Sequence, residues 1–101
     1  MLEIVITKSK TKDKKYDAII DGKKTIHFGA QGYQDQTTIT NNKERQERKD
    51  RYINRHKKTE NWNDPKTAGF YAKNILWNKK SVKASVEDTN KRFKNIHIKL
   101  S

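Results

Sequence analysis

YDAIIDGKKTIHF, residues 16–28, contains two β-like runs on either side of the dipeptide Asp21-Gly22. This dipeptide accepts positive φ at both central positions of a type I′ turn, which is the turn that suits two paired, twisted strands. The stretch therefore predicts a β-hairpin. Upstream, MLEIVIT at residues 1–7 alternates in the manner of a half-buried strand. The short link between these segments favours an antiparallel meander of three strands.

The first helix is predicted over residues 43–58, KERQERKDRYINRHKK, which contain no glycine, proline or valine. Asn41 or Asn42 could provide its N-cap. Tyr52 and Ile53 are its only strongly apolar residues. We therefore expect this helix to touch the core with its C-terminal half and to expose most of its surface.

A second helix is predicted to begin with Asp64 as N-cap and Pro65 at the first helical position. Gly69 is expected to let another element approach closely, and Asn78 to end the helix in the left-handed conformation. The predicted core stripe, at spacings of three and four residues, consists of Ala68, Tyr71, Ala72, Ile75 and Leu76.

The last two elements complete the expected fold. SVED, residues 85–88, has the form of a capping box and predicts a short helix that ends at Phe93. Alternation over residues 96–100 predicts a closing strand that joins the N-terminal sheet. The predicted fold is a single α+β domain, residues 1–101, in which about three helices pack on one face of a small antiparallel sheet. That sheet has three N-terminal strands plus the C-terminal strand.

Composition indicates a basic protein with a small core. The 101 residues include 24 Lys and Arg against 12 Asp and Glu, for a net charge of +12. Only 19 residues are Leu, Ile, Val or Phe, a share typical of disordered chains. However, these residues cluster at strand and helix spacings, which favours a folded domain. The charge favours polyanionic partners. No apolar run is long enough to span a membrane, and the absence of cysteine fits a reducing compartment.

The first predicted helix carries the densest positive charge, with eight Lys and Arg against three acids in residues 43–58. Its side chains could form a solvated face with i,i+4 ion pairs. Alternatively, they could form a line of guanidinium groups that grips phosphates. The residues at offsets 0, 3, 7 and 10, which lie along one line of the helix, are Arg45, Arg48, Tyr52 and Arg55. Nearby aromatic rings could stack on bases or belong to the core, as we expect for Tyr71 and Trp77. The residues predicted to bind nucleic acid are Arg45, Arg48, Arg51, Tyr52, Arg55, Lys57, Lys58 and Trp62.

Residues 27–35, HFGAQGYQD, contain two glycines directly after the predicted hairpin. They match neither a Walker loop nor a dinucleotide-binding fingerprint, since both motifs open a helix. We expect a bulge or tight exit at Gly29 and Gly32, with Tyr33 packed back on the sheet and Asp35 turning the chain toward the basic helix. A narrower hypothesis is that free backbone N–H groups here help the helix arginines to hold a phosphate.

An enzyme is the least favoured interpretation. A hydrolytic set, with His56 as general base, could be drawn from His27, Tyr33, Asp35, Arg55, His56, Glu60 and Asn63. The order of elements is loosely similar to that of GIY-YIG nucleases, but the paired strand motifs of that family are absent. The three histidines, at positions 27, 56 and 97, lack the spacing of a metal site. We therefore expect no catalytic residues, no metal and no cofactor.

Three stretches carry a family resemblance: HFGAQGYQDQTT, then RKDRYINRHKKTENWNDPKTAGFYAKNILWNK, then ASVEDTNKRF. Together they resemble a family of small basic proteins of unknown function from large DNA viruses of algae and amoebae. The resemblance covers roughly residues 16–93. It implies a virus-encoded protein, located in the virion or in the host cytoplasm and virus factory. It implies no activity.

The leading prediction is a small, non-enzymatic viral protein that binds nucleic acid, DNA or RNA, or another polyanion, through phosphate contacts from the basic helix. The alternative is a virion structural or minor capsid protein that binds other virion proteins. In that case an aromatic patch that includes Trp62 and Phe70 would form the interface.

Overall fold

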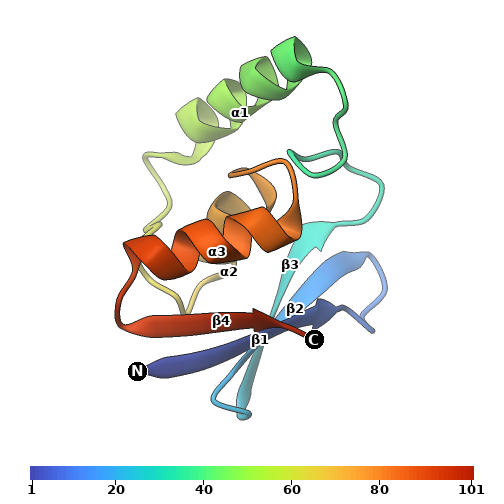
Figure 1. Ribbon diagram of the computed structural model, residues 1–101. Helices are drawn as coiled ribbons and strands as arrows, with labels where there is room; N and C mark the ends of the chain where they lie inside the picture. The colour runs from blue at the N-terminus through green and yellow to red at the C-terminus, as the bar shows by residue number, and fades with distance from the viewer.

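The computed structural model describes residues 1–101. Figure 1 shows one sheet with helices on one side of it. The elements in chain order are β1 (Leu2–Lys8), β2 (Lys14–Ile20), β3 (Lys24–Ala30), α1 (Asn42–His56), α2 (Ala68–Tyr71), the π-helix η1 (Ala72–Leu76), α3 (Val82–Arg92) and β4 (Ile96–Leu100). The strand order in the sheet is β3-β2-β1-β4. The predicted α+β fold, with three N-terminal strands and a C-terminal strand, is confirmed.

The predicted hairpin is also confirmed. Asp21 and Gly22 have φ values of 50° and 68°, and the turn closes with a hydrogen bond from Lys23 N to Ile20 O at 2.9 Å. Positive φ at both central residues is the mark of a type I′ turn. β2 pairs with both β1 and β3 in antiparallel fashion, as expected for a meander.

The sheet is mixed, and the expectation of a wholly antiparallel sheet was wrong for β4. This strand pairs with β1 in parallel, with Leu2 opposite Ile96 and Ile6 opposite Leu100. A parallel neighbour requires a long crossover connection. The three helices between β3 and β4 supply it, and they return the chain to the same end of the sheet at which β1 begins (Figure 1).

One hydrophobic core lies between the sheet and the helices. Its sheet residues are Ile4, Ile6, Ala18, Ile20, Ile26, Phe28, Ile96 and Ile98, and its helix residues are Phe70, Tyr71, Ile75, Leu76 and Val86. α1 contributes no buried residue. Figure 1 shows α3 and α2 close to the sheet, with α1 farther out beyond them.

The second helix begins later than predicted. Asp64 and Pro65 belong to a turn, and the N-cap is Thr67, whose Oγ1 accepts a hydrogen bond from Phe70 N at 3.2 Å. Asp64 instead accepts from Lys66 N within the turn, at 2.9 Å. Because the helix starts at Ala68, this residue lies at the exposed end and not in the core.

The predicted core positions of the later turns are confirmed for Tyr71, Ile75 and Leu76, but Ala72 is only half-buried. From Ala72 onward the helix widens to a π-helix, in which Trp77 N donates to Ala72 O at 3.0 Å. Single π-turns of this kind are rare and often occur at functional sites.

Buried polar groups support the π-helix from within. Asn74 is 1 % exposed, donates to Phe70 O at 2.9 Å and accepts from Arg92 Nη2 at 2.7 Å. Asn78 was expected to adopt a left-handed conformation, but it has no positive φ. It joins the π-helix to α3, because its Nδ2 donates to Asn74 O and to Asp88 Oδ2.

The N-cap of α3 is Ser81, whose side chain accepts from Ala84 N at 3.1 Å, so the prediction of a capping box at Ser85 was wrong. Ser85 is fully buried within the helix and accepts from Lys79 N at 2.9 Å. The helix does end at Phe93, as predicted. None of the helices combines the length and the apolar character that a membrane-spanning helix requires.

Candidate functional site

The segment over residues 29–39, which we call the glycine loop, contains the end of β3 and the turns that follow it, and its backbone requires its two glycines. Gly29 and Gly32 have φ values of 78° and 85°, a region that side chains with a Cβ rarely adopt. A Cβ at Gly29 would lie 2.8 Å from Leu76 Cδ1, so this glycine also lets the loop approach the π-helix. The expectation of a tight exit at these glycines is confirmed.

Asp35 holds this loop in place. It is 2 % exposed, and its Oδ2 accepts from Lys15 Nζ at 2.6 Å. Its Oδ1 accepts from the backbone N and the hydroxyl of Thr37, at 2.7 and 2.6 Å. Ile39 N donates to Asp35 O at 3.0 Å. Asp35 therefore turns the chain toward α1, as predicted.

Tyr33 was expected to pack back on the sheet, but 73 % of it is exposed. Lys15, from the start of β2, reaches beneath the loop and donates to Tyr33 O as well as to Asp35. The Lys15–Asp35 ion pair thus occupies the space beside the sheet, and the tyrosine ring points outward.

α1 is capped by Asn41, whose Oδ1 accepts from Glu44 N at 2.9 Å. Arg45, in its first turn, is turned toward the glycine loop. Its Nε donates to Gln36 O at 3.2 Å and its Nη2 donates to Ile39 O. Gln36 Nε2 in turn donates to Arg45 O at 2.7 Å. Arg45, which was predicted to bind phosphate, therefore attaches α1 to the glycine loop.

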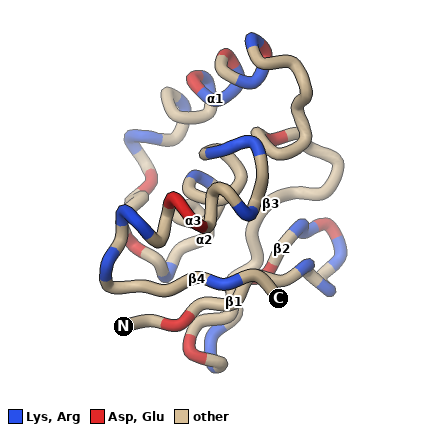
Figure 2. The backbone as a smooth tube through the Cα atoms, viewed as in Figure 1, with Lys and Arg blue, Asp and Glu red and all other residues tan.

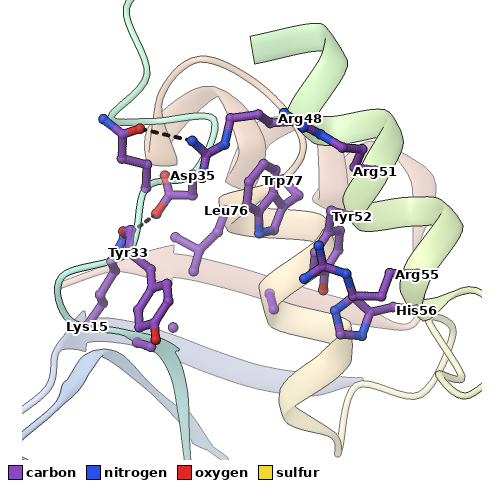
Figure 3. Close-up of a pocket in the computed structure, with 14 residues that line it drawn as sticks. Lys15, Tyr33, Asp35, Arg48, Arg51, Tyr52, Arg55, His56, Leu76 and Trp77 are labelled. Atoms are coloured by element: carbon purple, nitrogen blue, oxygen red, sulfur yellow. Dashed lines mark hydrogen bonds and ion pairs between the residues drawn. The ribbon is translucent and has the colours of Figure 1, made fainter. Parts of the chain in front are cut away.

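A cavity of about 560 Å³ lies between α1, the glycine loop and the π-helix. Figure 3 shows Lys15 and Tyr33 on one side, Tyr52, Arg55 and His56 on the other, and Leu76 and Trp77 between them. The 14 lining residues are Lys15, Gly29, Ala30, Tyr33, Gln34, Asp35, Arg48, Arg51, Tyr52, Arg55, His56, Ala72, Leu76 and Trp77. Its volume is in the range of clefts that hold small molecules.

The charge around the cavity is positive. Asp35 is its only acidic residue and is paired with Lys15. Arg48 lies 3.3 Å from Gln34 Oε1 and 3.5 Å from Glu44 Oε1, where surface exposure weakens the ion pair. Arg51 and Arg55 are exposed, and their side chains make no hydrogen bond or ion pair. The cavity therefore presents guanidinium groups with unused donors.

An aromatic column forms the wall below α1. The Tyr52 ring stacks on Trp77, with centroids 5.0 Å apart and planes at 10°. The Trp62 ring is also stacked with the Tyr52 ring, with centroids 6.4 Å apart. Burial, followed by the nearby charge of Glu60, raises the pKa of the Tyr52 hydroxyl to about 12, so this residue is neutral in the physiological range. The stack joins α1 to the π-helix.

The other predicted binding residues lie outside the cavity. Lys57 and Lys58 are exposed and lie in the turn that follows α1 and leads to Glu60. Trp62 does not line the cavity, and its indole Nε1 is buried without a hydrogen-bond partner. Phe70 is fully buried between helix and sheet, so the expectation that it forms part of an exposed aromatic interface was wrong.

The residues of the hypothetical hydrolytic set converge only in part. Tyr33, Asp35, Arg55 and His56 line the cavity, whereas His27, Glu60 and Asn63 lie elsewhere. His27 pairs with Asp17 on the sheet. Burial of the Asp17 carboxyl group acts to raise its pKa, but the hydrogen bond with His27 acts in the opposite direction, and the pKa is lowered overall. Glu60 faces Gly69, where an added Cβ would collide with Glu60 Oε2, so the expected close approach at this glycine is confirmed.

Sequence reasoning missed several residues of the site. Lys15 lies in a lysine-rich stretch without any periodic pattern, so nothing in the sequence distinguishes it from its neighbours. Gln34 lies in the glycine stretch that the sequence did single out, and its backbone N–H makes no hydrogen bond. It supplies the free backbone donor near Arg48 that the narrower hypothesis required.

A second hollow, of about 300 Å³, lies on another side of α1 and was also missed. It is lined by eight polar residues: Gln36, Asn42, Arg45, Gln46, Lys49, Asn78, Lys79 and Lys80. Figure 2 shows basic residues along α1 and on the segment before α3. No acidic residue lines this hollow, so positive charge surrounds α1 beyond the first cavity.

The fold and site together define a small α+β domain with a basic, aromatic-walled cavity at the edge of its sheet. A family described only as a family of unknown function, DUF5754, matches residues 4–56, and the chain belongs to this family. The match includes most of β1 together with β2, β3, the glycine loop and α1, and it contains all the basic residues of the cavity. No curated protein and no solved structure matches the chain.

Proposed function

We propose that the protein is a non-enzymatic module that binds nucleic acid through phosphate contacts from α1. The observation that carries this proposal is the grouping of Arg48, Arg51 and Arg55 along one wall of the cavity, with no acid to neutralise the last two. Guanidinium groups bind phosphate oxygens in bidentate fashion, and each carries several donors. An arginine that makes no contact within its own protein has these donors available for a ligand.

The rest of the molecule supports a polyanionic ligand. The chain has a net charge of +12, and basic residues surround α1 on both sides. Such a field raises the rate of encounter with nucleic acid and supplies affinity that does not depend on sequence. The free N–H of Gln34 and the arginine side chains are donors of the kind that contact the backbone of nucleic acids.

The groups that line the cavity are better suited to binding a ligand than to catalysing a reaction. His56 is the only histidine that lines it, and its ring is packed against Tyr52 at 4.6 Å. The acidic residue of the cavity, Asp35, is buried in contacts that hold the loop. A general base must lie within hydrogen-bond distance of the substrate proton that it removes, and a second group must orient the base. This supports binding rather than hydrolysis.

The setting that we propose follows the family resemblance in the sequence: a virus-encoded protein that acts in the virion or in the host cytoplasm and virus factory. A role in binding other virion proteins stays the alternative prediction. Mass spectrometry of purified particles would test the setting, since a protein absent from the particles has no structural role in them.

The binding proposal is tested by fluorescence anisotropy with labelled DNA and RNA oligonucleotides between about 50 and 200 mM salt. The variant is Arg51→Gln/Arg55→Gln, and the matched control is Lys23→Gln/Lys24→Gln. Both remove two exposed positive charges, but Lys23 and Lys24 lie at the β2–β3 turn, at the end of the sheet far from α1 (Figure 1).

We expect affinity for both nucleic acids to fall with salt, and the arginine variant to bind more weakly than the control. For single strands, the slope of log K against log salt is about −0.7 for each phosphate neutralised, so the arginine variant should lose about 1.4 of this slope. Absence of binding to either nucleic acid at about 50 mM salt would overturn the proposal. Equal losses in the two variants would show that α1 is not the binding surface.

A further inference from the structure

We propose that the cavity admits one unpaired nucleotide of a nucleic-acid strand, with its phosphate at the α1 arginines and its base against the ring of Tyr33. The protein would then prefer single-stranded over double-stranded nucleic acid. This inference rests on the proposed function, and it adds the class of nucleic acid and the residue that selects it.

The exposure of the Tyr33 ring is not explained by the packing of the fold. Three large apolar or aromatic residues of the chain are exposed, and the other two, Met1 and Leu100, lie at the chain ends. Tyr33 lies in the middle of the chain at the rim of the cavity, and its ring stacks on no other aromatic ring. An exposed ring beside a group of cations is the arrangement with which single-strand binders stack bases.

The backbone that carries this ring is fixed. Lys15 Nζ donates to Tyr33 O, Asp35 is tied to Lys15 and Thr37, and Gln31 N donates to Asp13 O at 3.0 Å. A ring on an ordered backbone loses less conformational entropy when a ligand binds than a ring on a disordered loop does. The tyrosine is thus held ready for contact.

The cavity has the two kinds of wall that a nucleotide requires. Arg48, Arg51 and Arg55 border it on the α1 side, and Leu76 and Trp77 form an apolar surface between α1 and the loop (Figure 3). A nucleotide combines a flat ring with a charged phosphate, so it can contact both walls at once. An inorganic phosphate would leave the apolar surface and Tyr33 unused.

The ligand is expected to be part of a strand and not a free nucleotide. Positive charge continues beyond the cavity, with Lys57 and Lys58 after the end of α1 and with the second hollow on the other side of the helix. A free nucleotide carries no further backbone phosphates for these groups. In a duplex, the bases are paired and stacked, and a base reaches a protein cavity only after it leaves the stack.

The test compares four ligands in the same anisotropy assay: a single-stranded oligonucleotide, an abasic strand of equal length, the duplex, and a free mononucleotide as competitor. DNA and RNA versions of the first strand are both used. The variants are Tyr33→Ala, which removes the ring, and Tyr33→Phe, which keeps it. Because 73 % of Tyr33 is exposed, both variants should fold, and thermal unfolding checks this.

The wild-type protein should bind the single strand about ten-fold more tightly than the abasic strand, which is the loss expected for one base–aromatic stack. Tyr33→Ala should abolish this preference and leave duplex binding unchanged, while Tyr33→Phe should retain it. The mononucleotide should compete weakly.

The inference would be overturned if Tyr33→Ala bound all ligands as the wild type does, or if duplex and single strand bound equally through the arginines. In both cases the proposed function would stand, because phosphate binding would remain. If no nucleic acid bound, the proposed function and this inference would fail together. Strong competition by the mononucleotide would assign the cavity to a free nucleotide and overturn the assignment to a strand.

Discussion

The sheet with α3 and the segment with α1 are stabilised in different ways. β1 to β4, α2, the π-helix and α3 contain all 13 residues of the core cluster. α1 has no buried residue and is held by the contacts of Arg45 with the glycine loop and by the Tyr52–Trp77 stack. Core packing therefore restricts which residues can occupy most positions of the sheet and of the helices that cover it. In α1, most positions are free of packing, which leaves their charges available for a ligand.

The largest expected effect is the loss of stability when a core side chain is truncated. Phe70→Ala should destabilise the protein by about 3–5 kcal/mol, because Phe70 is fully buried and contacts the rings of Tyr71 and Phe93. Arg51→Ala, in α1, should change stability by about 0.5 kcal/mol or less, since this side chain is exposed. Urea unfolding measures both, and equal losses would contradict the division of the molecule into two parts.

A smaller effect is expected where α1 is attached to the loop. Arg45→Ala removes hydrogen bonds from a charged donor to the carbonyl groups of Gln36 and Ile39, which contribute about 1.5–3 kcal/mol. Hydrogen exchange should therefore become about ten- to one-hundred-fold faster for the α1 amides, while exchange in the sheet changes little. The matched control is Arg55→Ala, which removes the same charge without these bonds. Equal exchange in both variants would show that Arg45 does not anchor the helix.

The smallest effect is a pH dependence at the junction of the π-helix and α3. The hydrogen bond from Asn78, together with the hydrogen bond and charge of Arg92, holds the pKa of the Asp88 carboxyl group below its ordinary value. As pH falls, the unfolded chain binds this proton first. The stabilisation is therefore present above the ordinary aspartate pKa of about 4 and is lost as the pH falls through the lower pKa of the folded state.

Thermal unfolding of Asp88→Asn between about pH 2 and pH 7 tests this sign. The advantage of the wild-type protein should be greatest near neutral pH and should shrink in acid. Asn78→Ala should show part of the same effect, because it removes one of the two hydrogen bonds to Asp88. A wild-type advantage that grows in acid would contradict the assignment.

Much of the fold followed from local patterns. The Asp21-Gly22 turn, the alternation of β1 and β4, and the cap of α1 depend on residues close in sequence. The first two were predicted, and the cap was narrowed to Asn41 or Asn42, of which the structure uses Asn41. The later helix starts were wrong because several polar residues there could serve as caps, and packing decided in favour of Thr67 and Ser81. The parallel pairing of β4 was missed because a strand pattern does not contain its direction relative to a distant partner.

The residues of the site also divide into those that the sequence predicted and those that it missed. Helical spacing placed Arg48, Tyr52 and Arg55 on one face, and the cavity contains all three. It also placed Arg45 there, but the loop carbonyls engage this residue first. Periodicity gives the direction of a side chain from its own helix, and it does not show what lies opposite. The position of Lys15 beneath the loop and the outward position of the Tyr33 ring depend on contacts across 18 to 20 residues.

The sequence by itself determined a basic α+β domain with a hairpin and an arginine-bearing helix, since charge, turn chemistry and periodicity are properties of neighbouring residues. Only the tertiary structure decided that the glycine loop, α1 and the π-helix surround one cavity with Tyr33 at its rim. The physical reason is that the three segments are brought together by contacts such as Gln36 with Leu76 and Tyr52 with Trp77, which join residues far apart in the chain.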